Sequence, residues 1–183
     1  MDLDAMQGVV MQASLPLRWE ERAEVPEFTL EGWMHANVAL LEGLATLESR
    51  GTEIDVPPGE AAARAFERLE AKLDVSLMLL ASVVTAHNGL PPCVPTSLSA
   101  QTIEWTTRET QPLPQQLLIH VFLSSQLPLP LRLPAELAHT EPRADGLHVR
   151  ARFVQFSEPM ADWLERTIFR HHRRLIQRQN RAR

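Results

Sequence analysis

Histidine and cysteine, the side chains that most often bind metals or act as catalysts, do not form a reactive set in this sequence. His171 and His172 are adjacent, so on a helix they point about 100 degrees apart and cannot share a metal ion. His87 falls in an apolar helix repeat, where a histidine at an interface is more common than a ligand. The single cysteine, Cys93, stands among prolines without a partner. The sequence therefore predicts no metal site and no disulfide.

The carboxylates and glycines also argue against catalysis. Asp162 and Glu165 share a helix face with Arg166 and Arg170, and ion pairing explains that spacing better than paired acid and base groups. The seven glycines are scattered and form no phosphate-binding loop. We expect no catalytic residue, no enzymatic activity and no resident cofactor.

Charge is distributed unevenly along the chain. The net charge is −5, yet residues 1–165 carry −12 and residues 166–183 carry seven arginines and no acid. Such a basic arm could bind nucleic acid through charge alone, or it could lie against an acidic surface of its own or a neighbouring subunit. We favour the second interpretation, because no aromatics are interleaved with the terminal arginines and arginine suits a helix C-terminus.

Length and hydropathy predict one globular domain over residues 1–183. The chain has 183 residues with 44% hydrophobic types, and no apolar run reaches the roughly 18 residues that cross a bilayer. Asp2 and Asp4 at the start do not resemble a signal peptide. We expect a cytoplasmic protein without membrane insertion.

One stretch has the spacing of a coiled-coil seam. Apolar or small residues alternate at steps of four and three at Ala62, Phe66, Leu69, Leu73, Ser76, Leu80, Val83 and His87. Polar Glu70 and Lys72 flank the seam early, whereas Leu77, Leu79 and Val84 flank it later. This widening favours a bundle of several helices over a two-stranded coil. We predict oligomerisation through Phe66, Leu69, Leu73, Ser76, Leu80 and Val83, with burial in an intramolecular helix hairpin as the alternative.

A second helix precedes the seam. Trp33, Asn37, Leu40, Leu44 and Leu47 repeat the same spacing, and Gly51 is a stop signal. The two helices are expected to form an insertion at residues 30–88.

Strands are expected on both sides of that insertion. Residues 9–19 read as a short edge strand around Pro16, and residues 94–156 alternate with period two. Pro130 and Pro134 place one of these strands at an edge or bulge, and a shift of phase after Phe153 predicts another bulge. Proline-rich connections between short strands favour a small antiparallel barrel, and the fold class is α+β.

The C-terminal helix is expected at residues 157–179. Ser157 is a good N-cap, and Pro159 falls in the first turn. An apolar stripe that includes Met160, Leu164 and Ile168 should pack on the barrel.

The order of these elements, with the strings SLSAQTIEW (97–105) and FVQFSEPMADWLERTIFRHHRR (153–174), resembles the PilZ family of bacterial cyclic di-GMP receptors. It is most similar to the atypical branch that carries a long heptad helix pair and forms tetramers. The resemblance extends from about Leu15 to Arg178. It implies a PilZ-type barrel with an inserted helix hairpin, a homotetramer, and other signalling proteins as partners.

The family's ligand site contains an Asp/Asn-x-Ser-x-x-Gly string on the first hairpin, which lets the backbone approach the nucleotide. Matched to this chain, the string falls on Ser97, Ser99 and Thr102. Ser99 keeps the family's residue, Ser97 lacks the carboxylate, and Thr102 is β-branched where the family has glycine. The resemblance therefore implies a degenerate site.

The family's other string, Arg-x-x-x-Arg in a free arm, uses guanidinium groups to bind phosphate and stack on guanine. Arg18 and Arg22 have that spacing, but Glu20 and Glu21 stand between them and Arg18 falls within a predicted strand. A chance match is the simpler interpretation of this pair.

These observations favour a non-enzymatic, oligomeric signalling module with a weakened nucleotide site. The alternative is a receptor that binds cyclic di-GMP through Arg18, Arg22 or the arginines of the final helix. A nucleic-acid binder that uses the arginine-rich terminus is the third hypothesis, and the acidic body argues against it.

Overall fold

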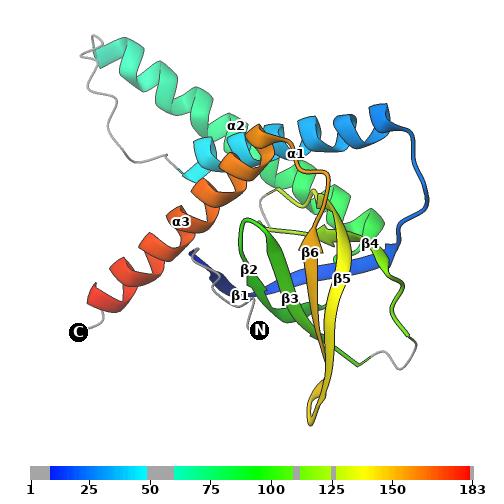
Figure 1. The fold of residues 1–183 in the computed structure, drawn as a ribbon. Coiled ribbons are helices and arrows are strands. Elements are labelled where there is room, and N and C mark those ends of the chain that lie inside the picture. Colours follow the sequence, from blue (N-terminus) through cyan, green and yellow to red (C-terminus); the bar gives the residue numbers. More distant parts are fainter. Residues whose placement is uncertain (1–8, 49–59, 109–111, 125–126, 182–183) are drawn as a thin grey trace.

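The computed structural model describes residues 9–48, 60–108, 112–124 and 127–181. In chain order the elements are β1 (Met11–Glu21), α1 (Glu27–Glu48), α2 (Glu60–Asn88), β2 (Cys93–Leu98), β3 (Thr102–Thr107), β4 (Gln116–Val121), β5 (Leu131–Arg143), β6 (Gly146–Phe153) and α3 (Glu158–Arg181). The strands form a closed antiparallel barrel in the order β1-β2-β3-β6-β5-β4 (Figure 1). The predicted α+β class and the small barrel are confirmed.

Strand β1 closes the barrel because its two halves pair with different strands. Residues 11–16 pair with β2, and residues 17–21 pair with β4. Pro16 lies where the pairing changes, so its missing N–H interrupts neither ladder. The prediction of an edge strand at residues 9–19 was therefore wrong, because proline here marks a change of partner.

Strand β5 also lies inside the sheet, between β4 and β6. Pro134 pairs with Leu118 of β4, but pairing with β6 begins only at Ala135. The Pro134 carbonyl accepts a hydrogen bond from the N–H of Val154, beyond the end of β6. A bulge falls between Leu137 and His139 of β5. The bulge that the sequence predicts after Phe153 is absent, because β6 ends there.

Inward-facing residues of all six strands fill the barrel, and the core continues into α1 and α3. Met34, Leu41 and Leu44 of α1 belong to the same buried cluster as Met160, Leu164 and Ile168 of α3. These two helices pack on each other and lie across one end of the barrel (Figure 1). The predicted packing of the C-terminal helix on the barrel is confirmed.

Helix α1 begins at Glu27, three residues earlier than expected, and its buried face is rotated from the predicted one. Met34 and Leu41 are buried, whereas Trp33 and Leu40 are half-buried. The face turns in this way because α1 packs on α3 and the barrel.

Helix α2 does not form an extended hairpin contact with α1. In the described part of the chain, α2 makes no extensive contact with another element, and its first half projects from the body of the molecule (Figure 1). Only four residues separate its last residue, Asn88, from β2, and two of these are Pro91 and Pro92. The strand and the helix are thus joined by a short and restricted connection.

Asn37 attaches α1 to the barrel. Its side chain is 2% exposed, its Nδ2 donates to the Arg132 carbonyl at 2.8 Å, and its Oδ1 accepts from the Arg132 N–H at 2.9 Å. Arg132 precedes the part of β5 that pairs with β6, so its backbone groups on that side have no strand partner. The asparagine amide completes the hydrogen bonding of β5 in place of a strand.

We expect Asn37→Ala to lower the free energy of unfolding by about 1–3 kcal/mol, because it leaves backbone polar groups without partners at a covered position. Urea unfolding followed by circular dichroism measures this. Thr46→Ala in the same helix is the control: the exposed Thr46 hydroxyl donates only to the Glu42 carbonyl, and its loss should change stability by less than about 0.5 kcal/mol. Equal losses for the two variants would contradict the role of Asn37.

Candidate functional site

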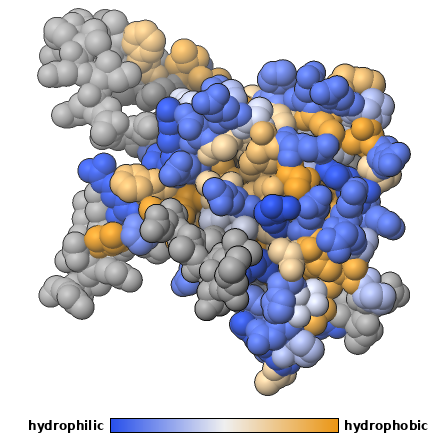
Figure 2. Space-filling model, viewed as in Figure 1, coloured by the Kyte–Doolittle hydropathy of each residue, from blue (hydrophilic) through white to orange (hydrophobic). Residues whose placement is uncertain are grey.

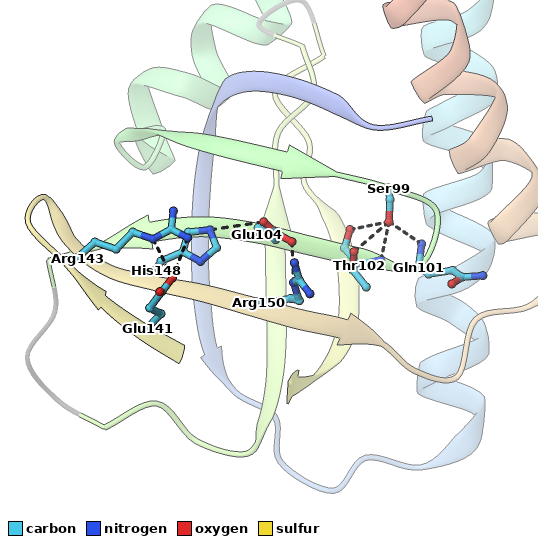
Figure 3. Close-up of polar contacts among 8 residues, drawn as sticks. All are labelled: Ser99, Gln101, Thr102, Glu104, Glu141, Arg143, His148 and Arg150. Carbon is cyan, nitrogen blue, oxygen red and sulfur yellow. Dashed lines mark hydrogen bonds and ion pairs between the residues drawn. The ribbon is translucent and has the colours of Figure 1, made fainter. Parts of the chain in front are cut away.

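The β2–β3 hairpin carries Ser97, Ser99 and Thr102, and its turn lies at Ala100 and Gln101. The Ser99 side-chain oxygen accepts hydrogen bonds from the backbone N–H groups of Thr102 at 2.9 Å and Gln101 at 3.2 Å (Figure 3). Ser99 is 4% exposed. This hydroxyl therefore closes the turn and is not presented to solvent.

On the outer face of the barrel, Glu104 of β3 joins two basic side chains of β6. Its Oε1 accepts from Arg150 Nε at 2.7 Å, and its Oε2 lies 3.5 Å from His148 Nε2 (Figure 3). The Glu104 side chain is 21% exposed. A carboxylate that contacts two basic groups in this way is arranged like a bound anion.

Two shallow cavities meet at Glu104. The first, of about 380 Å³, is lined by Ser97, Ser99, Thr102, Glu104 and Arg150, with Val10 and Gln12 of the neighbouring segment. The second, of about 400 Å³, extends along the same face toward His148 and Arg143. The structure therefore brings the three hairpin residues together, and it adds charged residues that the sequence interpretation did not select.

Arg143 and Arg152 on the same hairpin of β5 and β6 are also paired with acids. Arg143 Nη2 lies 2.8 Å from Glu141, and Arg152 Nη2 lies 3.2 Å from Glu136. The hydrogen bond from Arg143 lowers the pKa of the exposed Glu141 carboxyl. The outward basic residues of this face are thus matched by carboxylates of the chain itself.

Arg18 and Arg22 do not join this cluster. Arg18 pairs with His120 of β4, whereas Ser97 pairs with Gln12, six residues earlier on β1. Six residues of extended strand span about 20 Å. The structure therefore places the two sequence strings toward opposite ends of β1.

Arg22 is also fixed by its neighbours and does not lie in a free arm. Its Nη1 donates to Gln155 Oε1 at 2.6 Å and its Nη2 to Gln116 Oε1 at 3.1 Å. Gln155 has a φ of 58 degrees, a left-handed conformation that is uncommon outside glycine. Arg22 thus connects the end of β1 to the segment between β6 and α3.

The predicted seam of α2 is exposed within the single chain. Phe66, Leu69, Leu73, Leu80 and Val83 are 49–65% exposed. Ser76 is also exposed, and its hydroxyl donates to the Lys72 carbonyl at 2.9 Å. The side chains of Ala62 and His87 lie outside the described residues. Hydrophobic residues appear on the projecting helix in the space-filling view (Figure 2), so the chain itself does not cover the seam.

The basic end of α3 contacts an acid of α1. Glu48 lies 2.6 Å from Arg174 Nη1 and 3.4 Å from Arg170 Nε. Asp162 pairs with Arg166 at 3.4 Å, as its spacing predicted. These contacts support the interpretation that the arm lies against an acidic group of its own chain.

His120 forms a separate polar cluster on the outer face of β4. Its Nε2 lies 3.1 Å from Glu20 Oε1, and its strand partners are Arg18 and Arg132. Its Nδ1 is buried without a hydrogen-bond partner in the described part of the chain. Burial lowers the pKa of His120 below 6.5, with Arg18 and Arg132 acting in the same direction, while the contact with Glu20 opposes the shift.

Sequence reasoning missed Glu104, because its partner Arg150 is 46 residues away and only the strand register joins them. The period-two alternation of residues 94–156 is consistent with an outward basic row of His148, Arg150 and Arg152, but nothing local indicated which acids would face it. Within the described residues, no group of three histidine, cysteine, aspartate or glutamate side chains is placed to hold a metal ion. Across the same part of the chain, no helix has the length and apolar character needed to cross a membrane.

Comparison with protein families gives one match over most of the chain. The family described as "Atypical PilZ domain, cyclic di-GMP receptor" matches residues 41–181. No curated protein shows significant similarity to the chain.

A solved structure shows the same fold. A protein from Xanthomonas campestris, described as a new tetrameric PilZ domain self-assembled through an unusual helical bundle, aligns with a TM-score of 0.78 and 22% identity. The alignment covers 94% of this chain and 92% of that one. The Bacillus subtilis inhibitor of motility aligns over 50% of this chain and 43% of its own, with a TM-score of 0.36 and 12% identity.

We expect the free energy of unfolding to decrease as the pH is lowered below about 6.5, in part because of His120. A histidine with a lowered pKa in the folded state stabilises the fold above its unfolded pKa, and that contribution is lost as the pH decreases through the folded value. Urea unfolding should show that the free energy of unfolding differs less between pH 8 and pH 5 for His120→Gln than for the wild type. His139→Gln, at an exposed position of β5, is the control and should keep the wild-type difference.

Proposed function

The chain belongs to the atypical PilZ domain family, and on that premise we propose that it is a non-enzymatic signalling module of bacterial cyclic di-GMP pathways that works as a self-assembled scaffold. It associates through α2, binds other signalling proteins, and has a weakened dinucleotide site. Its place in the cell is the cytoplasm.

The exposed seam of α2 is the observation that carries this proposal. Between Leu73 and Val83, apolar side chains face solvent on several sides of the helix, and Ala81 is the one buried side chain among those described in this stretch. A helix that is apolar on several sides is stable in water only when other helices surround it. The structural neighbour that is described as a tetramer assembles through a helical bundle, which is consistent with α2 playing this part here.

The geometry of the β2–β3 hairpin supports the proposal that the dinucleotide site is weakened. The Ser99 hydroxyl is occupied in closing its own turn, and Thr102 begins β3 with a branched side chain where the family string has glycine. Arg18 and Arg22 lie toward the other end of β1, and Arg22 is held by two glutamines. The two strings proposed for nucleotide binding therefore lie far apart within the chain, which supports the proposed weakening.

We expect Leu73→Asp with Leu80→Asp to dissociate the assembly, because unpaired charges buried in the seam cost several kcal/mol. Light scattering at micromolar protein should give a multiple of 20.7 kDa for the wild type and 20.7 kDa for the variant. Circular dichroism should show that the barrel remains folded.

The matched control is Arg68→Glu. Arg68 is exposed, lies in the first half of α2 where the flanks of the seam are polar, and at 100 degrees per residue faces away from Leu73 and Leu80. This variant also changes the net charge by −2 and should keep the wild-type mass. A wild type of 20.7 kDa would contradict the proposed assembly, and an intact Leu73→Asp, Leu80→Asp assembly would place the interface elsewhere.

Calorimetry with cyclic di-GMP tests the weakened site. We expect no heat for the wild type at about 100 micromolar ligand, which corresponds to an affinity weaker than about −5.5 kcal/mol. Ser97→Asp with Thr102→Gly should recover binding only in part, because residue 97 is the cross-strand partner of Glu104 and two carboxylates would then face each other. Binding by the wild type would instead favour a receptor that uses other residues.

A further inference from the structure

The outer face of the barrel carries a basic pair whose anion is supplied by the chain itself. Both oxygens of Glu104 face basic groups: Oε1 at 2.7 Å from Arg150 Nε and Oε2 at 3.5 Å from His148 Nε2. The three residues come from adjacent strands, β3 and β6, in which Glu104 pairs with Arg150. Figure 3 shows this carboxylate between the two basic side chains.

Carboxylates and phosphates compete for the same donors, because a guanidinium presents N–H groups in a geometry that fits either anion. Glu104 is well placed for that competition. It lines both cavities, and its side chain is only 21% exposed, so it is held close to the barrel surface. A phosphate that approached Arg150 would meet the charge of Glu104 at the same position.

We propose that Glu104 acts as a built-in competitor that keeps phosphate-bearing ligands, and cyclic di-GMP in particular, away from Arg150 and His148. The inference rests on the proposed weakening of the dinucleotide site and names the residue that causes it. Glu104 would thus determine ligand specificity at a position outside the string of Ser97, Ser99 and Thr102.

The placement of Glu104 gives a reason to expect that restoring the hairpin residues alone does not restore the site. Ser97, Ser99, Thr102 and Arg150 line the same cavity as Glu104. Any dianion that reached the hairpin through this cavity would come close to the Glu104 carboxylate. Two negative charges a few ångströms apart at a protein surface repel each other strongly enough to oppose binding.

The test is calorimetry with cyclic di-GMP on full-length Glu104→Gln. This change keeps the shape of the side chain and removes its charge. We expect binding with a dissociation constant of about 10 micromolar or below, at least tenfold tighter than the roughly 100 micromolar at which the wild type should give no heat, a factor that corresponds to about 1.4 kcal/mol. The double variant Glu104→Gln with Arg150→Gln should lose that gain, because the phosphate partner is then absent.

Glu136→Gln is the matched control. Glu136 pairs with Arg152 at 3.2 Å on the same outer face, but it lines neither cavity. Its replacement changes the net charge by the same amount and should leave the affinity at the wild-type value. If Glu104→Gln is poorly folded by circular dichroism, Glu104→Thr removes the carboxylate with a residue that favours strands and should give the same gain.

Two results would overturn the inference: no gain in a folded Glu104 variant, or an equal gain for Glu136→Gln. Both differ from a failure of the proposed function. That failure would be seen in the wild type, as cyclic di-GMP binding at about 100 micromolar or as a mass of 20.7 kDa.

Discussion

Closure of the barrel through β1 is the constraint on which the other features depend. The first half of this strand completes the ladder with β2 and the second half completes the ladder with β4. Each strand then has a neighbour on both sides, and the inward residues form one core that α1 and α3 cover at one end. Because of this division, Arg18 and Arg22 at the end of β1 lie far from the β2–β3 hairpin.

Local periodicity was sufficient to find the elements but not their partners. The period-two alternation of residues 94–156 predicted strands such as β6, whose Val149, Ala151 and Phe153 are buried, and Ser157 predicted the start of α3, because both signals are local. Pro16 was misread as an edge marker, since the sequence does not show where one ladder ends and the next begins. The role of Asn37, hidden in an apolar repeat, depends on the same information. Pro134 did indicate an edge or bulge: it lies just before the pairing with β6 begins, and β5 has a bulge between Leu137 and His139.

The candidate site was predictable only where a family string located it. Ser97, Ser99 and Thr102 do lie together on one hairpin, but the pairing of Glu104 with Arg150 arises from the register of β3 and β6. The seam of α2 was found from spacing alone, because an exposed helix keeps its full repeat in the sequence. The position of α2 relative to α1 could not be predicted from spacing, because packing between helices depends on the whole fold.

The molecule therefore divides into two working surfaces with different physics. The α2 surface is apolar and under the proposed function contacts other helices, whereas the barrel face is polar and its charges are balanced within the chain. A balanced face of this kind is better suited to hydrogen bonding with a protein partner than to attracting a small dianion, because its fixed charges of opposite sign cancel at a distance.

The short connection between α2 and β2 has a consequence for how these surfaces act together. With Pro91 and Pro92 in a four-residue junction, the barrel has little freedom to swing about the end of the helix. In an assembly built on α2, identical barrel faces would be displayed at a fixed spacing and orientation. A target with repeated epitopes at that spacing would be retained by avidity, even if each single contact were weak.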